Sequence, residues 1–205
     1  MNTEKSLQIK VSNSTNLRSR VNKLYIPKTK SLLPLFEVIS NSIHAIIEKK
    51  EIEKSYQGKI IINLIRNGSN ETHKHLDNND KYPIKSFEVI DDGIGLNDEN
   101  LNSFQEFDSE KKFKIGGKGI GRLVCLKLFS KLIVESIYEK NKRYYFRTFD
   151  YKKNSKEGFD NFDEGEVFNK NESGTKVTLF EFDEDYNTAE AKAYELEKEA
   201  DPQMS

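Results

Sequence analysis

The sequence has few of the features on which disulfide frameworks and membrane spans depend. Its 205 residues include one cysteine, Cys125, so no internal disulfide can form and a reducing compartment is indicated. The apolar runs, such as 60–62, fall far short of the ~20 residues that a membrane helix needs. The N-terminal segment MNTEKSLQIK lacks the apolar centre of a secretory signal. We therefore predict a cytoplasmic protein without a membrane partner.

An excess of charge of one sign is also missing. Lys and Arg number 33 and Asp and Glu number 34, a formal net charge of −1, which provides no general attraction to nucleic acid or anionic lipid. Hydrophobic residues make up only 35% of the chain, but 13 Phe and 9 Tyr argue against global disorder. The chain is predicted to have one domain at 31–185, with a lead-in segment at 1–30 and, at 186–205, a charged helical tail or the start of a following region.

Hydrophobic periodicity predicts one clear helix, at 31–50. Its apolar residues recur at the spacing of a single buried stripe: Leu32, Phe36, Ile39, Ile43 and Ile46. Ser31 is the expected N-cap, and Pro34 falls in the first turn, where proline is tolerated. Shorter helices are predicted at 17–24, 97–107 and 122–130.

Short β-branched or alternating segments predict strands at 7–11, 58–66, 84–90, 132–138, 143–150, 166–168 and 176–182. The polar segment 67–82 is typical of a loop, and 108–121, which mixes Lys with Gly, is typical of a flexible segment.

The predicted strand at 84–90 runs into Asp91, and glycines follow at alternate positions, Gly93 and Gly95. Glycine lets the backbone bend sharply and lets a ligand approach it closely. A carboxylate at a strand end can accept a hydrogen bond from an exocyclic amine such as that of adenine. An ordinary turn explains the same pattern equally well, because Asp and Gly dominate turns.

A glycine-rich segment directly precedes the predicted helix at 122–130, with Gly116, Lys118, Gly119 and Gly121 among its residues. Such a segment exposes several backbone N–H groups, and the helix N-terminus adds a partial positive charge, which favours an anion site over a flexible linker. It is not a P-loop, since Gly119 stands where Ser or Thr is required. It also lacks the third glycine of a dinucleotide fingerprint.

The helix at 31–50 carries a second, polar face formed by Glu37, Asn41, His44 and Glu48. A carboxylate and an amide one turn apart suit a water and a metal-bound phosphate, although a solvated helix face is the simpler interpretation. Near the end of the chain, Gly174-Thr175 enters an alternating strand, a pattern that any hairpin can show.

Taken in order, these four segments resemble the GHKL ATPase superfamily of gyrase-type topoisomerases, ninety-kilodalton heat-shock chaperones, sensor histidine kinases and mismatch-repair ATPases. The resemblance rests on Glu37-x-x-x-Asn41, Asp91-x-Gly93-x-Gly95, Gly116-x-x-Gly119-x-Gly121 and Gly174-Thr175. It covers about residues 31–182 and looks most like the chaperone and its bacterial ATP-binding relatives. The implied fold is α+β, a two-layer sandwich in which helices cover one face of a mixed, mostly antiparallel sheet.

The resemblance also implies ATP and Mg²⁺ as cofactors and gives roles to residues at the adenine end. Asp91 would accept the adenine amino group, and Thr175 would support the base through its hydroxyl. Gly93 and Gly95 would let the base and the sugar pack against backbone.

At the phosphate end, Asn41 would hold Mg²⁺ and Glu37 would be the general base that orients the attacking water. The resemblance implies a lid over the phosphates, built from Gly116, Gly119 and Gly121, with Lys118 as an additional charge.

Two features depart from the family pattern. His44 stands where chaperone-like members have an acid, and the chain ends at Ser205 with no room for the following transducer domain that often supplies a lysine. The resemblance therefore implies a weak ATPase whose lid closure is coupled to a protein partner or a further C-terminal region.

Three alternatives stay open. A nucleotide sensor without turnover would have the same motifs. Segment 142–147 interleaves basic and aromatic residues as in a nucleic-acid-binding strand, but the balanced net charge favours an ordinary amphipathic hairpin. A histidine kinase is disfavoured, because none of the three histidines falls on a separate dimerisation helix.

Overall fold

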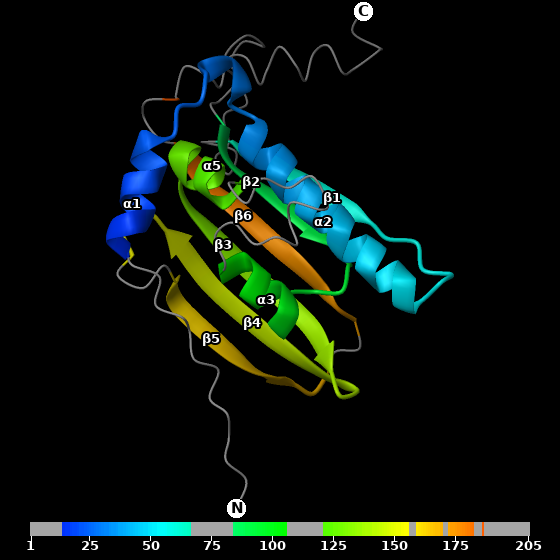
Figure 1. Ribbon diagram of the computed structural model, residues 1–205. Coiled ribbons are helices and arrows are strands. Elements are labelled where there is room, and N and C mark those ends of the chain that lie inside the picture. Colours follow the sequence, from blue (N-terminus) through cyan, green and yellow to red (C-terminus); the bar gives the residue numbers. More distant parts are fainter. Residues whose placement is uncertain are drawn as a thin grey trace, which may run out of the picture.

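A computed structural model of the chain describes residues 14–66, 84–105, 121–155, 159–169, 172–182 and 186. In this part of the chain, helices lie across one face of a six-stranded sheet (Figure 1). The two layers confirm the predicted α+β sandwich. The sheet was expected to be mixed, but every described strand pair is antiparallel.

The strands are β1 (Ile60–Arg66), β2 (Ile84–Asp91), β3 (Phe129–Lys140), β4 (Arg143–Lys152), β5 (Phe159–Val167) and β6 (Gly174–Phe182). Their order across the sheet is β1-β2-β6-β3-β4-β5. β6, the last of the described strands in the sequence, thus lies between β2 and β3. β5 is much longer than the predicted 166–168. The prediction missed most of this strand because its sequence is acidic and contains glycine, which is not typical of a strand. The segments predicted at 7–11 and 67–82 lie outside the described residues.

The helices are α1 (Ser14–Lys23), α2 (Leu33–Ile52), α3 (Asp98–Gln105) and α5 (Gly121–Leu128). None of these described helices is long and apolar enough to cross a membrane. The helix predicted at 122–130 ends at Leu128, because Phe129 and Ser130 already belong to β3.

The start of α2 differs from the prediction. Pro34 does fall in the first turn, but Leu32 is the N-cap residue, and no side chain caps the helix. Ser31 has helical backbone angles, φ −62° and ψ −24°, because it ends a short 3-10 turn at Lys28–Lys30. Ser31 thus lies one residue before the N-cap position and is not the cap residue of α2.

The predicted buried stripe of α2 was wrong in part: Leu32 and Ile39 pack against the core, but two other members do not. Phe36 is 59% exposed and Ile43 is 45% exposed, whereas Pro34, Val38 and Ser42 are buried. Helix α2 is therefore rotated so that a polar residue faces the sheet. The cost of burying Ser42 is offset by a hydrogen bond described below.

The hydrophobic core extends into the segment that precedes α2. Leu17 and Val21 of α1 are each 1% exposed and pack in the same core cluster as Leu126 of α5. Tyr186 is also buried, and its hydroxyl donates a hydrogen bond to the carbonyl of Ile26 at 3.3 Å. Residues on both sides of the predicted domain thus contribute to one core, and the predicted limits at 31 and 185 stay predictions.

Candidate functional site

A row of polar side chains crosses the sheet on the face that the helices cover. Asp91 of β2 pairs with Thr175 of β6, which pairs in turn with Ser136 of β3. Ser136 pairs with Arg147 of β4, and Arg147 pairs with Glu164 of β5. Side chains that face each other across antiparallel strands point to the same side of the sheet. These five residues, which we call the polar row, come from five strands.

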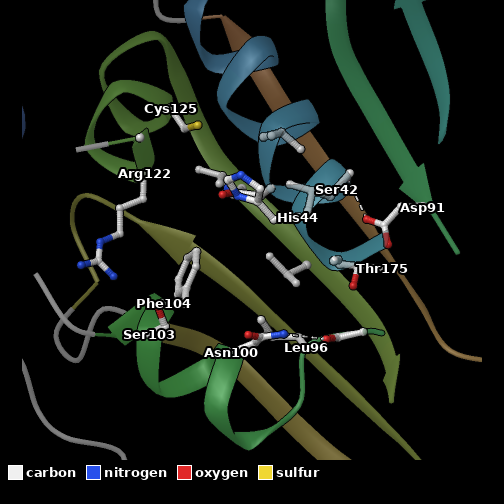
Figure 2. A pocket seen from close by; sticks show the side chains of 18 of the residues that line it. Ser42, His44, Asp91, Leu96, Asn100, Ser103, Phe104, Arg122, Cys125 and Thr175 are labelled. Carbon is white, nitrogen blue, oxygen red and sulfur yellow. Dashed lines mark hydrogen bonds between the residues drawn. The ribbon is translucent and has the colours of Figure 1, made fainter. Parts of the chain in front are cut away.

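A cavity of about 240 Å³ lies between the sheet and the helices, beside the polar row. Its floor consists of apolar side chains from β3, β4 and β6: Leu132, Val134, Phe149 and Val177. Its walls come from three helices: Asn41, Ser42, His44 and Glu48 of α2; Glu99, Asn100, Ser103 and Phe104 of α3; and Gly121, Arg122 and Cys125 of α5 (Figure 2). An apolar floor with a few convergent polar groups is typical of a small-molecule site.

Asp91 is the buried carboxyl group of this cavity, with 6% of its surface exposed. The Ser42 hydroxyl donates a hydrogen bond to its Oδ2 atom at 2.8 Å, and the backbone N–H of Gly93 donates to Oδ1 at 3.0 Å. Burial raises the pKa of Asp91 above its ordinary value, although the bonds from Ser42 and Gly93 act in the opposite direction. Because each carboxylate oxygen has two lone pairs, Asp91 can still accept a hydrogen bond from a ligand.

Ser42 belongs to the site, although the sequence reasoning did not select it. It lines the cavity and fixes the carboxylate of Asp91 from the opposite layer of the fold (Figure 2). A hydroxyl residue directly after Asn41 in an otherwise isoleucine-rich helix was the available signal.

The two glycines after Asp91 allow close packing of the backbone. A Cβ atom on Gly93 would lie 2.7 Å from the carbonyl carbon of Ala45, so helix α2 rests directly on this residue. Gly95 has a φ of +80°, and a Cβ atom there would collide with the carbonyl oxygen of Ile137 in β3. Gly95 also lines the cavity. Contact of either glycine with a base or a sugar stays a prediction.

Thr175 lies beside Asp91 at the start of β6 and lines the cavity. Its hydroxyl is 3.0 Å from the Ser136 hydroxyl, which also accepts a hydrogen bond from the backbone N–H of Leu96 at 2.8 Å. A side chain at Gly174 would collide with the carbonyl oxygen of Asp91. The Gly-Thr pair therefore places a hydroxyl next to the buried carboxylate.

Glu37, Asn41 and Gly121 lie near one another, at the junction of α2 and α5. Asn41 lines the cavity, whereas Glu37 does not. A Cβ atom on Gly121 would collide with the Glu37 carboxylate, so that carboxylate lies against the first residue of α5. The predicted lid residues Gly116, Lys118 and Gly119 are part of a segment outside the described residues.

Metal binding was predicted through Asn41. Among the described residues, no group of three or more His, Cys, Asp or Glu side chains is arranged to hold a metal ion. This does not conflict with Mg²⁺, which usually keeps several waters and binds one or two protein oxygens together with substrate phosphates. The amide oxygen of Asn41, at the cavity wall, suits that kind of coordination.

Arg122 is a second residue that the sequence reasoning missed. It lines the cavity from the first turn of α5, is 7% exposed, and its guanidinium carbon lies 5.5 Å from the centre of the Phe104 ring (Figure 2). Lys118 was the positive charge predicted for the phosphate end, and Arg122 is a further positively charged residue that lines the cavity. The signal in the sequence was a basic residue directly after the last glycine of the glycine-rich segment.

An α+β sandwich with a buried carboxylate, Asp91, at the end of an apolar cavity, followed by Gly93 and Gly95, is typical of an ATP-binding domain of the GHKL type. Residues 33–175 match the family described as histidine kinase-, DNA gyrase B- and HSP90-like ATPase. The match begins at the start of α2, ends at Thr175 and spans most of the chain, so the chain belongs to this family. No curated protein matches the chain.

Proposed function

We propose that this domain binds Mg·ATP in the cavity and that closure of the segment 108–121 over the phosphates is coupled to a partner or a further domain. The observation that carries the proposal is the buried carboxylate of Asp91. It is held by Ser42 and Gly93 and lies at the polar end of an otherwise apolar floor.

The adenine end of the ligand is assigned to the polar row. The exocyclic amine would donate a hydrogen bond to Asp91, and the hydroxyl of Thr175 would support the same edge of the base. The ring would then cover Val134 and Val177, which are apolar and line the floor. An apolar floor under a buried acceptor favours a planar base that carries an amino group.

The phosphate end is assigned to the start of α5. A helix N-terminus has a partial positive charge, and Gly121, the first residue of α5, places this end of the helix at the cavity wall, where Arg122 adds a full positive charge. Asn41 would hold Mg²⁺, which when bound neutralises phosphate charge. Glu37 would orient the attacking water, and Gly116, Lys118 and Gly119 would complete the lid.

A nucleotide sensor without turnover is the second candidate. It is favoured by one observation, that the Glu37 carboxylate lies against Gly121 and does not line the cavity. Turnover by the unaltered chain that disappears in Glu37→Ala would decide for the ATPase. A cytoplasmic location and a likeness to the chaperone branch stay predictions.

A nucleic-acid partner is not proposed. Of the basic residues in segment 142–147, Arg147 is fully buried and Arg143 lies 3.4 Å from Glu166. Both arginines are thus bonded to carboxylates of the same domain, which removes most of the support for a nucleic-acid-binding strand.

The test is calorimetry with Mg·ADP on the unaltered chain and on Asp91→Asn. Asparagine replaces an acceptor oxygen with a donor, so we expect binding to weaken by about 1–3 kcal/mol, the cost of a buried polar contact that is lost. Equal ADP affinity in the two proteins would contradict the adenine assignment. Glu135→Gln is the control, because Glu135 is a half-exposed carboxylate of β3 that pairs with Lys176 and does not line the cavity.

A further inference from the structure

Arg147 is the largest of the fully buried side chains in the described part of the chain, with 0% of its surface exposed. It belongs to the polar row, where Ser136 separates it from Thr175. Burying a guanidinium is costly unless all of its charge is paired and its N–H groups are bonded. The partners of Arg147 therefore show what this charge does in the fold.

The guanidinium of Arg147 joins the sheet to the start of α3. Its Nη1 atom donates a hydrogen bond to the carbonyl oxygen of Leu96 at 2.6 Å, and Nη2 donates to Oδ1 of Asp98 at 2.8 Å. On its other side, Nε donates to Oε2 of Glu164 at 2.8 Å, and the Tyr138 ring centre lies 4.6 Å from the guanidinium carbon. The guanidinium thus holds both Leu96, just before α3, and Asp98, the first residue of α3.

Helix α3 is the wall of the cavity that faces α2. Its far end is held by Phe104, whose ring centre is 5.7 Å from that of Phe149 and 5.3 Å from that of Tyr151. In the first turn of the helix, the amide of Asn100 donates a hydrogen bond to Glu48 of α2 at 3.0 Å, at an exposed position. The part-buried bonds from Arg147 attach the N-terminal end of α3 to the sheet, beside the bond from the backbone N–H of Leu96 to Ser136.

We propose that Arg147 is a positioning residue of the nucleotide site, which fixes Leu96 and α3 against the cavity and so holds a bound nucleotide in place. This inference rests on the proposed function. A guanidinium suits the role because its five N–H donors lie in one rigid plane and bond a carbonyl and two carboxylates in different directions, whereas lysine has three donors on a single nitrogen.

The kinetic consequence concerns release of the ligand. If α3 loses its attachment, the wall opens more often and a bound nucleotide escapes faster. The rate of encounter changes little, because among variants of one site most differences in affinity appear in the dissociation rate. A residue that only stabilised the fold would lower the melting temperature without this selective change.

Two carboxylates on the same guanidinium provide a matched pair of variants. Asp98 connects Arg147 to α3, whereas Glu164 connects it to β5. Their side chains are similarly exposed, 33% and 30%. Asp98→Ala and Glu164→Ala each remove one negative charge from Arg147, but only the first removes a bond between Arg147 and α3. Lys140→Ala is a further control, because Lys140 also bonds Asp98, at 2.7 Å.

The experiment is stopped-flow dissociation of a fluorescent ADP analogue from the full chain in the presence of Mg²⁺, with folding checked by circular dichroism. We expect the dissociation rate to rise about tenfold in Asp98→Ala and to stay within about twofold of the unaltered chain in Glu164→Ala and Lys140→Ala. Asp98→Glu should restore most of the slow release. In an Arg147→Met background, Asp98→Ala should have no further effect, because the two residues act through one contact.

An unchanged dissociation rate in Asp98→Ala, or an equal rise in Glu164→Ala, would overturn the positioning role while leaving nucleotide binding in place. Full additivity of Asp98→Ala and Arg147→Met would do the same. If the unaltered chain binds no ADP analogue, the proposed function itself fails, and the role of Arg147 in the site fails with it.

Discussion

The hydrogen bond between Ser42 and Asp91 connects the two layers of the domain at the proposed adenine site. Ser42→Ala removes the donor and leaves the carboxylate of Asp91 buried with one partner fewer. A hydrogen bond to a charged group contributes about 1.5–3 kcal/mol. Alanine recovers about 0.5 kcal/mol through its higher helix propensity. We therefore expect the free energy of unfolding to fall by about 1–2.5 kcal/mol.

The measurement is urea denaturation followed by circular dichroism at neutral pH. A hydrogen bond from Ser42 is strongest when the carboxyl group of Asp91 is ionised. Ser40→Ala is the matched control, because Ser40 is an exposed residue of the same helix and undergoes the same chemical change. It should be neutral or slightly stabilising, since only the helix propensity changes. The difference between the two variants isolates the contact with Asp91.

The same variant also tests the site. Without the Ser42 hydroxyl, the pKa of Asp91 should rise further above its ordinary value, because burial then acts with one opposing hydrogen bond fewer. Mg·ADP should bind more weakly to Ser42→Ala than to Ser40→Ala. The reasoning would be refuted if Ser42→Ala were as stable as Ser40→Ala and bound ADP equally well.

Further predictions concern turnover, packing, the lid and pH. The unaltered chain should hydrolyse ATP more slowly than about 1 s⁻¹ in a phosphate-release assay, and Glu37→Ala should abolish that activity while leaving ADP affinity nearly intact; turnover that survives would exclude Glu37 as the base. Gly93→Ala should lower the melting temperature, since a Cβ atom would lie 2.7 Å from the α2 backbone at Ala45; an unchanged melting curve would contradict this packing. Mg·ATP should slow tryptic cleavage at Lys111, Lys112 and Lys114, and identical rates with and without nucleotide would count against a phosphate-binding lid. As the pH is lowered, the affinity for adenosine should begin to fall at a higher pH than the pKa of an ordinary Asp, about 3.9, because burial raises the pKa of Asp91 and only the ionised form is a full acceptor. Calorimetry across this pH range should find no such fall in Asp91→Asn.

Local patterns in the sequence determined most of the elements and the order of the motifs. The helix around Asn41 and the strand that ends at Asp91 depend on the spacing of apolar residues within a few turns or a few strand positions. The Asp-x-Gly-x-Gly turn is also local, because Gly95 needs a positive φ whatever lies around it. These features could be predicted because the interactions that produce them lie close together in the chain.

The tertiary structure alone decided which side chains meet at the site. Asp91, Thr175 and Ser136 become neighbours only because β6 lies between β2 and β3, and no local pattern specifies that order. The rotation of α2, which brings Ser42 to Asp91 and leaves Phe36 and Ile43 exposed, depends on packing against the sheet. Segment 142–147 was expected to form an ordinary amphipathic hairpin, and the burial of Arg147 could not be predicted from it, because the partners Glu164 and Asp98 lie outside the segment.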